Sequence, residues 1–298
     1  MKGPKSKKSM NEPLKEQSPS SALLAGPLRV GKIFYTNCIP FYHGLQKKEE
    51  EDLHYFESYP ARINQTMRQA KIDIAPISSL EYLNHQQDYL LLPFSIGARD
   101  FSGSVILFSH EKIEGLNGAT IALTRESLSS AALLKILLKF KFKFKNKFLT
   151  TDSDPAEMLA RHPAALVIGD DALFYQPRQF VYKYDLGELW WDWTEKPFCF
   201  ALWAVRRAVA RERPEEVAQF VKKIKQNLER NLADIEGLIH RSLGLNFLDE
   251  RFSRIFGYLF NLNYYLDSSM GEGLELFFRL AHRLKISPRP EPPEFFNF

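Results

Sequence analysis

Small polar residues mark the points where several predicted strands end and the following helices begin. They are Asn37, Ser78, Ser79, Thr124, Ser127, Ser129, Ser130 and Asp170. Backbone N–H groups at a helix start point outward and carry the positive end of the helix dipole, so such positions bind carboxylates. Hydroxyl groups add hydrogen-bond donors without burying a further charge. Because the carboxyl ends of neighbouring strands converge on one cleft, this pattern predicts a site for a small anion, most simply a carboxylate.

Each of these residues also has a structural explanation that needs no ligand. Ser78 and Glu81 have the spacing of a helix capping box. Ser127 or Ser129 can cap the helix that follows them, and Asn37 can belong to a turn. The prediction of a site therefore depends on the convergence of several strand ends rather than on any one side chain.

Sequence motifs for other kinds of site are missing from the chain. It contains neither a Gly-x-x-x-x-Gly-Lys-Ser/Thr phosphate loop nor a Gly-x-Gly-x-x-Gly turn after a strand, so nothing indicates a nucleotide cofactor. The histidines are scattered without metal-ligand spacing, and no Gly-x-Ser-x-Gly elbow occurs. We therefore expect neither a cofactor nor a metal ion, and no serine-hydrolase chemistry.

The charge distribution argues against nucleic acid as a partner. The chain has 298 residues and a formal net charge of +4, and residues 1–27 alone contain five Lys and two Glu, or +3. The remaining body is nearly neutral, whereas nucleic-acid-binding proteins present a basic face. The alternating Lys and Phe of residues 139–148 are typical of a half-exposed strand or of a passage from a helix to a strand, rather than of a membrane or nucleic-acid patch.

Residues 1–27 are polar and rich in Lys, Ser and Pro, which predicts a disordered leader. Their longest apolar run, ALLA, is too short for the core of a secretion signal, and the chain has no stretch of about 20 apolar residues for a membrane span. Cys38 and Cys199 are too few for a disulfide framework and are expected to be reduced. We therefore expect a cytoplasmic protein that does not contact a membrane.

The elements that must position the polar residues alternate between strands and helices. Apolar runs predict strands at 28–35, 72–77, 118–124, 164–168 and 198–205. Two further apolar runs within 89–109 are separated by a predicted loop at 97–103. Amphipathic spacing predicts helices at 60–71, 125–140, 154–163 and, over most of its length, 214–285.

This order of elements predicts an α/β fold of two lobes with a helical C-terminal segment. Residues 28–105 would begin the first lobe, residues 106–202 would form the second, and residues 203–298 would complete the first lobe and add the C-terminal helices. Strands that cross between the lobes would leave a ligand cleft in the middle.

Seven segments of the chain occur in the order, and at about the spacing, of the chorismate dehydratase family, whose enzymes act in the futalosine route to menaquinone. The segments are RVGKIFYTNCIPFYHGL, DIAPISSLEYL, SVILFS, GATIALTRESLSSAALLKILL, VIGDDAL, YDLGELWWDWTEKPFCFALWAV and LNYYLDSSMGEGLELFFRLAH. The chain thus resembles this family from about residue 28 to its C-terminus. The resemblance implies the two-lobe fold (type II) of periplasmic binding proteins, used here as a cytoplasmic enzyme.

The reaction implied by the resemblance removes water from chorismate and gives 3-[(1-carboxyvinyl)oxy]benzoate without a cofactor. The proton leaves the ring carbon that bears the enolpyruvyl ether, and the hydroxyl group leaves the neighbouring carbon. A carbanion-like (E1cB) path is reasonable because the ring carboxylate is conjugated, and formation of the aromatic ring drives the reaction. Preorganised neutral donors suit this chemistry, since they hold a dianion and stabilise the charge that spreads into the ring carboxylate.

The same resemblance implies roles for the polar residues. Asn37 matches the family's strand-end Asn and is expected near the reacting ring. The residues that match the family's Ser-Ser pair and hydroxyl-rich helix start are assigned to carboxylate binding; they are Ser78, Ser79, Thr124, Ser127, Ser129 and Ser130. Asp170 is the best candidate for a protein acid or base, although a helix cap or a hydrogen bond between the lobes explains it equally well. A carboxylate of the substrate is the alternative base.

The chain departs from the family pattern in two places. Thr194, Glu195 and Lys196 stand where Thr-Gly is expected, close to the predicted hinge. In the predicted loop at 97–103, Arg99 could contact an anion or remain solvated. Neither departure removes a residue that is assigned to the site.

Two other functions fit the same architecture. The sister enzyme that makes dihydroxynaphthoate from a cyclised futalosine is expected to have a catalytic His, whereas the nearest His here, His43, lies just past a turn. The other alternative is a non-catalytic cytoplasmic protein that binds a small carboxylate; as a sensor it should carry a DNA-binding or signalling domain, and none is evident. The sequence assigns no oligomeric state.

Overall fold

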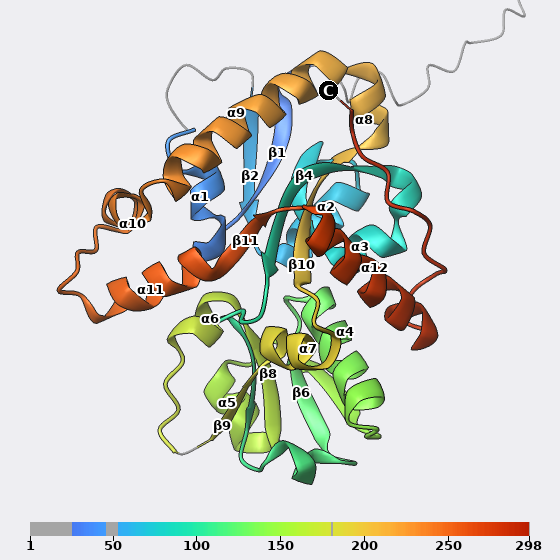
Figure 1. Ribbon diagram of the computed structural model, residues 1–298, viewed down its shortest axis with the longest axis vertical. Helices are drawn as coiled ribbons and strands as arrows, with labels where there is room; N and C mark the ends of the chain where they lie inside the picture. Colours follow the sequence, from blue (N-terminus) through green and yellow to red (C-terminus); the bar gives the residue numbers. More distant parts are fainter. Residues whose placement is uncertain (1–25, 46–52, 180, 298) are drawn as a thin grey trace, which may run out of the picture.

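The computed structural model describes residues 26–45, 53–179 and 181–297, which form two lobes, one above the other in Figure 1. Each lobe is built around one β-sheet. The described chain passes from the first lobe to the second through residues 99–104 and returns through residues 195–197. The two-lobe α/β fold that was expected from the sequence is confirmed.

The first sheet has the strand order β11-β4-β10-β3-β1-β2. These strands are β11 (Leu262–Tyr265), β4 (Tyr89–Ala98), β10 (Phe198–Arg206), β3 (Ile74–Ser78), β1 (Leu28–Ile33) and β2 (Leu53–Ser58). The second sheet has the order β7-β6-β8-β5-β9. These strands are β7 (Lys147–Thr151), β6 (Thr120–Thr124), β8 (Ala164–Ile168), β5 (Val105–Ser109) and β9 (Tyr182–Asp185).

Both sheets repeat the same arrangement. Strand β1 pairs in parallel with β2 and β3, and β6 pairs in parallel with β7 and β8. An antiparallel strand that enters from the other lobe follows next in each sheet: β10 pairs with β3 in the first sheet, and β5 pairs with β8 in the second. The residues that follow β1, β3, β6 and β8 consequently face the opposite lobe, which is the usual place for a ligand in α/β proteins.

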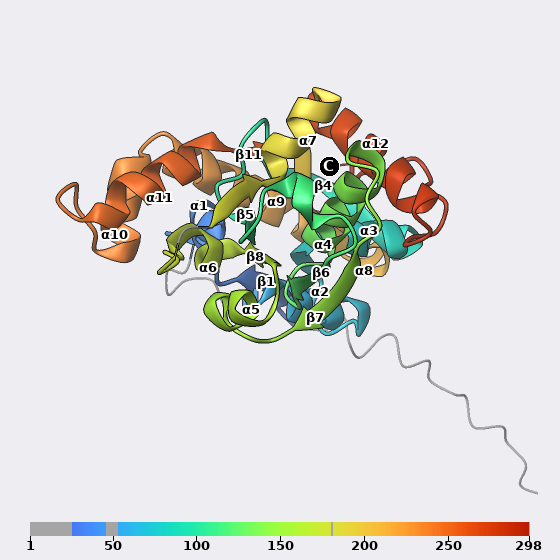
Figure 2. The same ribbon diagram turned by 90° about the horizontal axis from the view of Figure 1, so that it is seen from below.

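Helices cover both sheets. In the first lobe they are α1 (Ile39–Tyr42), α2 (Pro60–Arg68), α3 (Ser79–Asn84), α8 (Arg207–Glu212), α9 (Pro214–Leu232), α10 (Ile235–Leu243), α11 (Glu250–Asn261) and α12 (Ser268–Arg283). In the second lobe they are α4 (Leu128–Ile136), α5 (Pro155–Arg161), α6 (Gly169–Phe174) and α7 (Leu186–Thr194). Helices α4 and α7 pack on one face of the second sheet and α5 and α6 on the other (Figure 2).

The predicted elements are found with shortened ends. The strand predicted at 28–35 ends at Ile33, because a 3-10 turn over Thr36–Cys38 follows it. In the Lys- and Phe-rich run, a π-helical turn ends at Lys141 and β7 begins at Lys147, which confirms the predicted passage from helix to strand. The C-terminal region is mostly helical as predicted, but it also contributes β11, which pairs with β4 and so covers an otherwise open sheet edge.

The unusual residue Glu195 lies where the chain returns to the first lobe. It follows the last turn of α7 with a φ of +54°, the left-handed conformation for which glycine is normally chosen. Its neighbour Lys196 forms an ion pair with Glu272 of α12 at 2.6 Å. The sequence change therefore leaves the left-handed turn in place.

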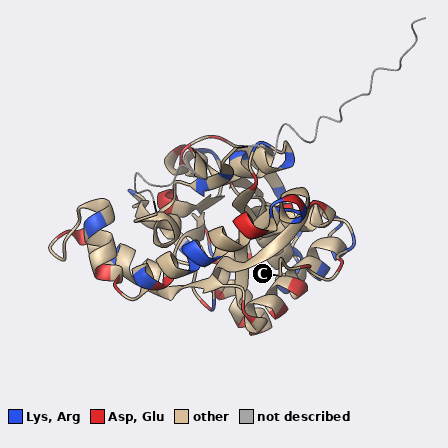
Figure 3. Cartoon of the chain, turned by 90° about the horizontal axis from the view of Figure 1, so that it is seen from above, with Lys and Arg blue, Asp and Glu red and all other residues tan. Residues whose placement is uncertain are grey.

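The surface carries both signs of charge. Seen from above, Lys and Arg are interspersed with Asp and Glu over the helices of the first lobe (Figure 3). In the part of the chain that the structure describes, no helix is long and apolar enough to cross a membrane. The same part contains no cluster of three His, Cys, Asp or Glu that could hold a metal ion. The predicted leader, apart from Gly26 and Pro27, lies outside the described residues.

Candidate active site

A cavity of about 70 Å³ lies between the two sheets. Its polar lining consists of Tyr35, Asn37, Ser78, Ser102, Ser104, Ser127, Ser130 and Tyr258. Its apolar lining includes Ile33, Ile96, Val105, Ile168, Phe200 and Leu262. None of the described lining residues carries a charged side chain, so the cavity presents neutral hydrogen-bonding groups against apolar walls.

Two hydrogen bonds join the lobes beside this cavity. The hydroxyl of Tyr35, which follows β1, donates to the carboxylate of Glu126 in the second lobe. The backbone N–H of Leu80 in α3 donates to Ser129 Oγ in α4 at 3.0 Å. Because small-molecule sites commonly enclose roughly 300–1,000 Å³, a substrate must part the lobes or displace side chains in order to bind.

The turn that carries Asn37 is held firmly by the first lobe. Pro40 lies in the first turn of α1, and the buried ring of Phe41 packs 5.1 Å from that of Trp203, between ring centroids. From α9, Asn231 Nδ2 donates to the Pro40 carbonyl at 2.9 Å. The turn after β1 is thus fixed by packing and hydrogen bonds on the side away from the cavity, which leaves Asn37 to face inward.

Asn37 presents an unused acceptor to the cavity. Its side chain is hydrogen-bonded to Tyr258 of α11. Its Oδ1 is buried and has no hydrogen-bond partner among the described residues. An acceptor left unpaired in this way costs about 1–3 kcal/mol, so a ligand that donates a hydrogen to this oxygen would remove the penalty.

Ser78 has a free hydrogen-bond donor. Its Oγ accepts from the N–H of Glu81 and from Asn64 Nδ2, both at 3.2 Å. The first of these bonds is the helix cap predicted from the sequence. Since a hydroxyl oxygen has two lone pairs and both are used, the hydroxyl hydrogen of Ser78 is left for the cavity.

The start of α4 offers a second free donor. Ser127 Oγ accepts from the N–H of Ser130 at 3.1 Å, so Ser127 caps the helix, and it donates to Ser130 Oγ at 2.8 Å. Ser130 therefore uses its oxygen as an acceptor, and its own hydroxyl hydrogen remains available to the cavity. Four residues singled out from the sequence, Asn37, Ser78, Ser127 and Ser130, are thus brought together.

The structure places the other predicted residues outside the cavity lining. Ser79 is fully buried and donates to the Cys199 carbonyl at 2.6 Å. Ser129 makes the bond to Leu80 between the lobes, and Thr124 Oγ1 accepts from the N–H of Glu126 at 3.4 Å. These three hydroxyls form hydrogen bonds within the protein and do not line the cavity. Arg99 is exposed and does not line the cavity.

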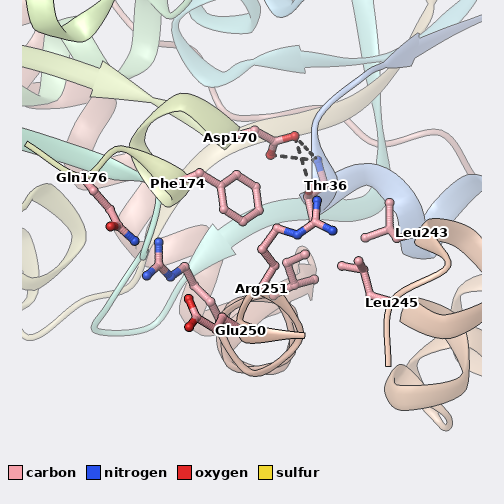
Figure 4. A pocket seen from close by; sticks show the side chains of 10 residues that line it. Thr36, Asp170, Phe174, Gln176, Leu243, Leu245, Glu250 and Arg251 are labelled. Atoms are coloured by element: carbon pink, nitrogen blue, oxygen red, sulfur yellow. Dashed lines mark hydrogen bonds between the residues drawn. The ribbon is translucent and has the colours of Figure 1, made fainter. Parts of the chain in front are cut away.

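Asp170 also connects the lobes. It accepts hydrogen bonds from the Thr36 backbone N–H and hydroxyl, each at 3.1 Å (Figure 4). Burial raises the pKa of this carboxyl, and the bonds from Thr36 act in the opposite direction. The hydrogen bond between the lobes that was offered as the alternative explanation of Asp170 is therefore present.

The pair formed by Thr36 and Asp170 faces a second, larger pocket of about 480 Å³ between α6 and α11 (Figure 4). Two guanidinium groups line it. Arg251 is paired with Asp249 at 2.9 Å, and Arg254 donates to the Leu173 carbonyl at 3.2 Å. This pocket lies beside the first cavity, since residues 36 and 170 line the pocket and residues 35, 37 and 169 line the cavity.

A glycine allows the Tyr35 ring to lie close to β8. Gly169 has a φ of +63°, and a Cβ there would stand 2.7 Å from the ring of Tyr35. Burial, followed by the hydrogen bond to Glu126, raises the pKa of the Tyr35 phenol, so its proton is held in place. Tyr35 therefore acts as a neutral donor that joins the lobes at the cavity wall.

The loop that brings Ser104 to the cavity is anchored by a buried carboxylate. Asp185, at the start of α7, accepts from the N–H and hydroxyl of Ser102 at 3.1 and 2.9 Å and from the N–H of Gly103 at 2.7 Å. Burial raises the pKa of Asp185 and the bonds from Ser102 lower it. The crossing segment between β4 and β5 is thus fixed against the second lobe.

Sequence reasoning missed four polar residues of the lining, Tyr35, Ser102, Ser104 and Tyr258. The first three lie close to segments that were recognised, and only their place at strand ends could have indicated them. Tyr258 lies in the helical C-terminal region, far from the other site residues in sequence, and no local pattern distinguishes it.

Comparisons with known proteins agree with this architecture. A family model described as menaquinone biosynthesis matches residues 28–283. A chorismate dehydratase from Thermus thermophilus is 30% identical over 268 residues, which cover 84% of this chain and 94% of that protein. Similar solved structures include a protein from Archaeoglobus fulgidus, with a TM-score of 0.67, 17% identity and coverage of 87% of this chain and 98% of that one. The periplasmic aliphatic sulphonate binding protein of Escherichia coli has a TM-score of 0.62, 14% identity and coverage of 89% and 94%.

Proposed function

Because this chain belongs to the menaquinone biosynthesis family, we propose that it is a chorismate dehydratase, which removes water from chorismate to give 3-[(1-carboxyvinyl)oxy]benzoate. The observation that carries the proposal is the cavity between the lobes, which is lined by uncharged residues and in which several hydroxyl groups accompany the unpaired Oδ1 of Asn37. Such a cavity suits a substrate that brings its own two negative charges and needs fixed neutral donors.

The residues that line the cavity are assigned different roles toward the substrate. Ser78 and Ser130 direct hydroxyl hydrogens into it from opposite lobes and would bind the substrate carboxylates. Asn37 would lie against the reacting ring. The apolar side chains of the lining lower the local dielectric, which strengthens each of these interactions as charge moves into the ring carboxylate.

The base is best supplied by the substrate. None of the described residues that line the cavity is Asp, Glu or His, and Asp170 is engaged with Thr36 on the side of the neighbouring pocket. A substrate carboxylate therefore takes the proton from the ring carbon. Asp170 contributes by holding the turn that presents Asn37, and its role is positional.

The proposal is tested by mixing the purified protein with chorismate, without added metal or nucleotide, and following the loss of cyclohexadiene absorbance. Steady turnover is expected. Binding of chorismate without turnover would instead identify a carboxylate-binding protein, and turnover of a cyclised futalosine alone would identify the sister dihydroxynaphthoate-forming enzyme. The absence of a His from the described cavity lining speaks against the sister enzyme.

A further inference from the structure

Three side chains from distant segments form a hydrogen-bonded chain at one corner of the cavity. Asn37 comes from the turn after β1, Ser104 from the segment that leads into β5, and Tyr258 from α11. Ser104 Oγ lies 2.8 Å from the Tyr258 hydroxyl oxygen, and Asn37 bonds to the same hydroxyl. Ser104 and Tyr258 are each only 5% exposed. Nothing in the sequence reasoning had assigned a role to Ser104 or Tyr258.

The hydrogen bonds among these three side chains have one direction, from Asn37 to Tyr258 and from Tyr258 to Ser104. Since Oδ1 of Asn37 has no partner, it is the amide nitrogen that donates to the Tyr258 oxygen. Buried hydroxyls rarely leave their hydrogen unused, and the acceptor within reach of Tyr258 is Ser104 Oγ. Ser104 then has its own hydroxyl hydrogen free, and it lines the cavity.

The corner therefore offers one acceptor and one donor, Oδ1 of Asn37 and the hydroxyl of Ser104. A carboxylate would gain from the donor but would be repelled by the carbonyl oxygen of the amide. A hydroxyl group satisfies both, because it can donate to Asn37 and accept from Ser104 at the same time. The donor groups of Ser78 and Ser130 are left for the carboxylates.

We propose that Asn37 and Ser104 bind the leaving hydroxyl group of the substrate and that Tyr258 is the positioning residue that orients both of them. This inference rests on the proposed dehydratase function. The electron pair of the broken C–H bond forms the new ring double bond as the C–O bond breaks. The electron pair of the C–O bond stays on the oxygen, and Ser104 stabilises that oxygen through its hydrogen bond. The departing hydroxide takes up the proton that the substrate carboxylate removed from the ring carbon, and one water is formed.

The test compares turnover with binding of the product, which lacks the leaving hydroxyl. In Tyr258→Phe and Ser104→Ala, kcat for chorismate is expected to fall about 10- to 100-fold. The dissociation constant of the product is expected to stay within about twofold of wild type, since the corner makes no bond to it. The double variant should lose less than the product of the two single effects, because both substitutions act on one chain.

The matched control is Tyr264→Phe. Tyr264 is also buried, but its hydroxyl has no hydrogen-bond partner among the described residues and does not line the cavity. Its removal should leave kcat unchanged. An active wild type whose Tyr258→Phe variant keeps full kcat would overturn this inference alone, as would a loss of product affinity as large as the loss of kcat. A wild type that binds chorismate without converting it would overturn the proposed function, and this inference with it.

Discussion

Asn37 lies in the turn after β1 and lines the cavity, so a change of one atom in its side chain should lower the catalytic rate. In Asn37→Asp the shape is kept, but a negative charge is placed beside a dianionic substrate and the donor to Tyr258 is lost. We expect kcat to fall at least about 100-fold. Steady-state kinetics would measure the effect, with the thermal midpoint checked to confirm folding. A variant with the full rate would remove Asn37 from the site.

Ser78 and Ser79 are neighbours with different tasks, and their substitution should separate binding from stability. Ser78→Ala loses a helix cap and a donor to the substrate, so we expect a KM about 10-fold higher and a stability loss of about 1 kcal/mol. Ser79→Ala loses the bond to Cys199, which should cost a similar free energy of unfolding without changing KM. Equal KM values for the two variants would argue against this division.

At the residue scale, the sequence predicted the part of the site that strand ends present directly. Asn37, Ser78, Ser127 and Ser130 were found because small polar residues follow strands at these points. The sequence could not show that Ser79 and Ser129 lie outside the cavity lining. Neighbouring residues at a helix start point in different directions, and the local sequence does not reveal which of them faces the cavity. Tyr258 could not be found, because only the folded chain brings α11 to the turn after β1.

At the element scale, the start of α6 must leave room for the ring of Tyr35. Gly169→Ala should lower activity, because its Cβ would push the ring away from Glu126 and disturb the contact between the lobes. Gly118→Ala is the control: this residue also has a positive φ, of +82°, but nothing lies within 4 Å of the added atom. Both variants should lose about 1 kcal/mol of unfolding free energy through the left-handed backbone, Gly169→Ala should lose more because the Tyr35 ring must also move, and only Gly169→Ala should lose kcat/KM. Equal activities would contradict the packing role of Gly169.

A substitution just after the end of α7 is expected to raise the free energy of unfolding rather than lower it. Glu195 is exposed and holds a left-handed conformation after the helix, so Glu195→Gly should raise the free energy of unfolding by about 1 kcal/mol. The same substitution at exposed Glu188, in the first turn of the helix, should lower it by about 0.5–1 kcal/mol. Denaturant titration measures both. A destabilised Glu195→Gly protein would show that the Glu195 side chain supports the crossing segment.

The elements that the sequence predicted are those with long apolar or amphipathic runs, such as β1, β3, β6, β8 and α9. Strands β2 and β9 lie at sheet edges; the alternation of apolar and polar residues is interrupted in β2 at Phe56, and β9 is only four residues long. Strand β11 is four residues long and follows a helix directly, and its conformation is set by pairing with β4. Such elements depend on a partner that local sequence cannot reveal.

At the scale of the whole molecule, two sheets that share one arrangement over five strands, with β11 added to the first, face each other with the carboxyl ends of their parallel strands inward. Alternating strands and helices followed by a helical tail were sufficient to predict this architecture, because few arrangements bury so many apolar strands. The hydrogen bonds between the lobes, from Tyr35 to Glu126 and from Leu80 to Ser129, could not be predicted, since each joins segments far apart in sequence.

The cavity between the lobes, with its uncharged lining, is expected to be the place where water is removed from chorismate. Incubation of the purified protein with saturating chorismate, followed by mass spectrometry and NMR of the mixture, tests it most directly. The predicted result is conversion to a compound that is lighter by one water and carries an aromatic ring with the enolpyruvyl ether intact. Recovery of unchanged chorismate from protein that has been shown to bind it would contradict the claim.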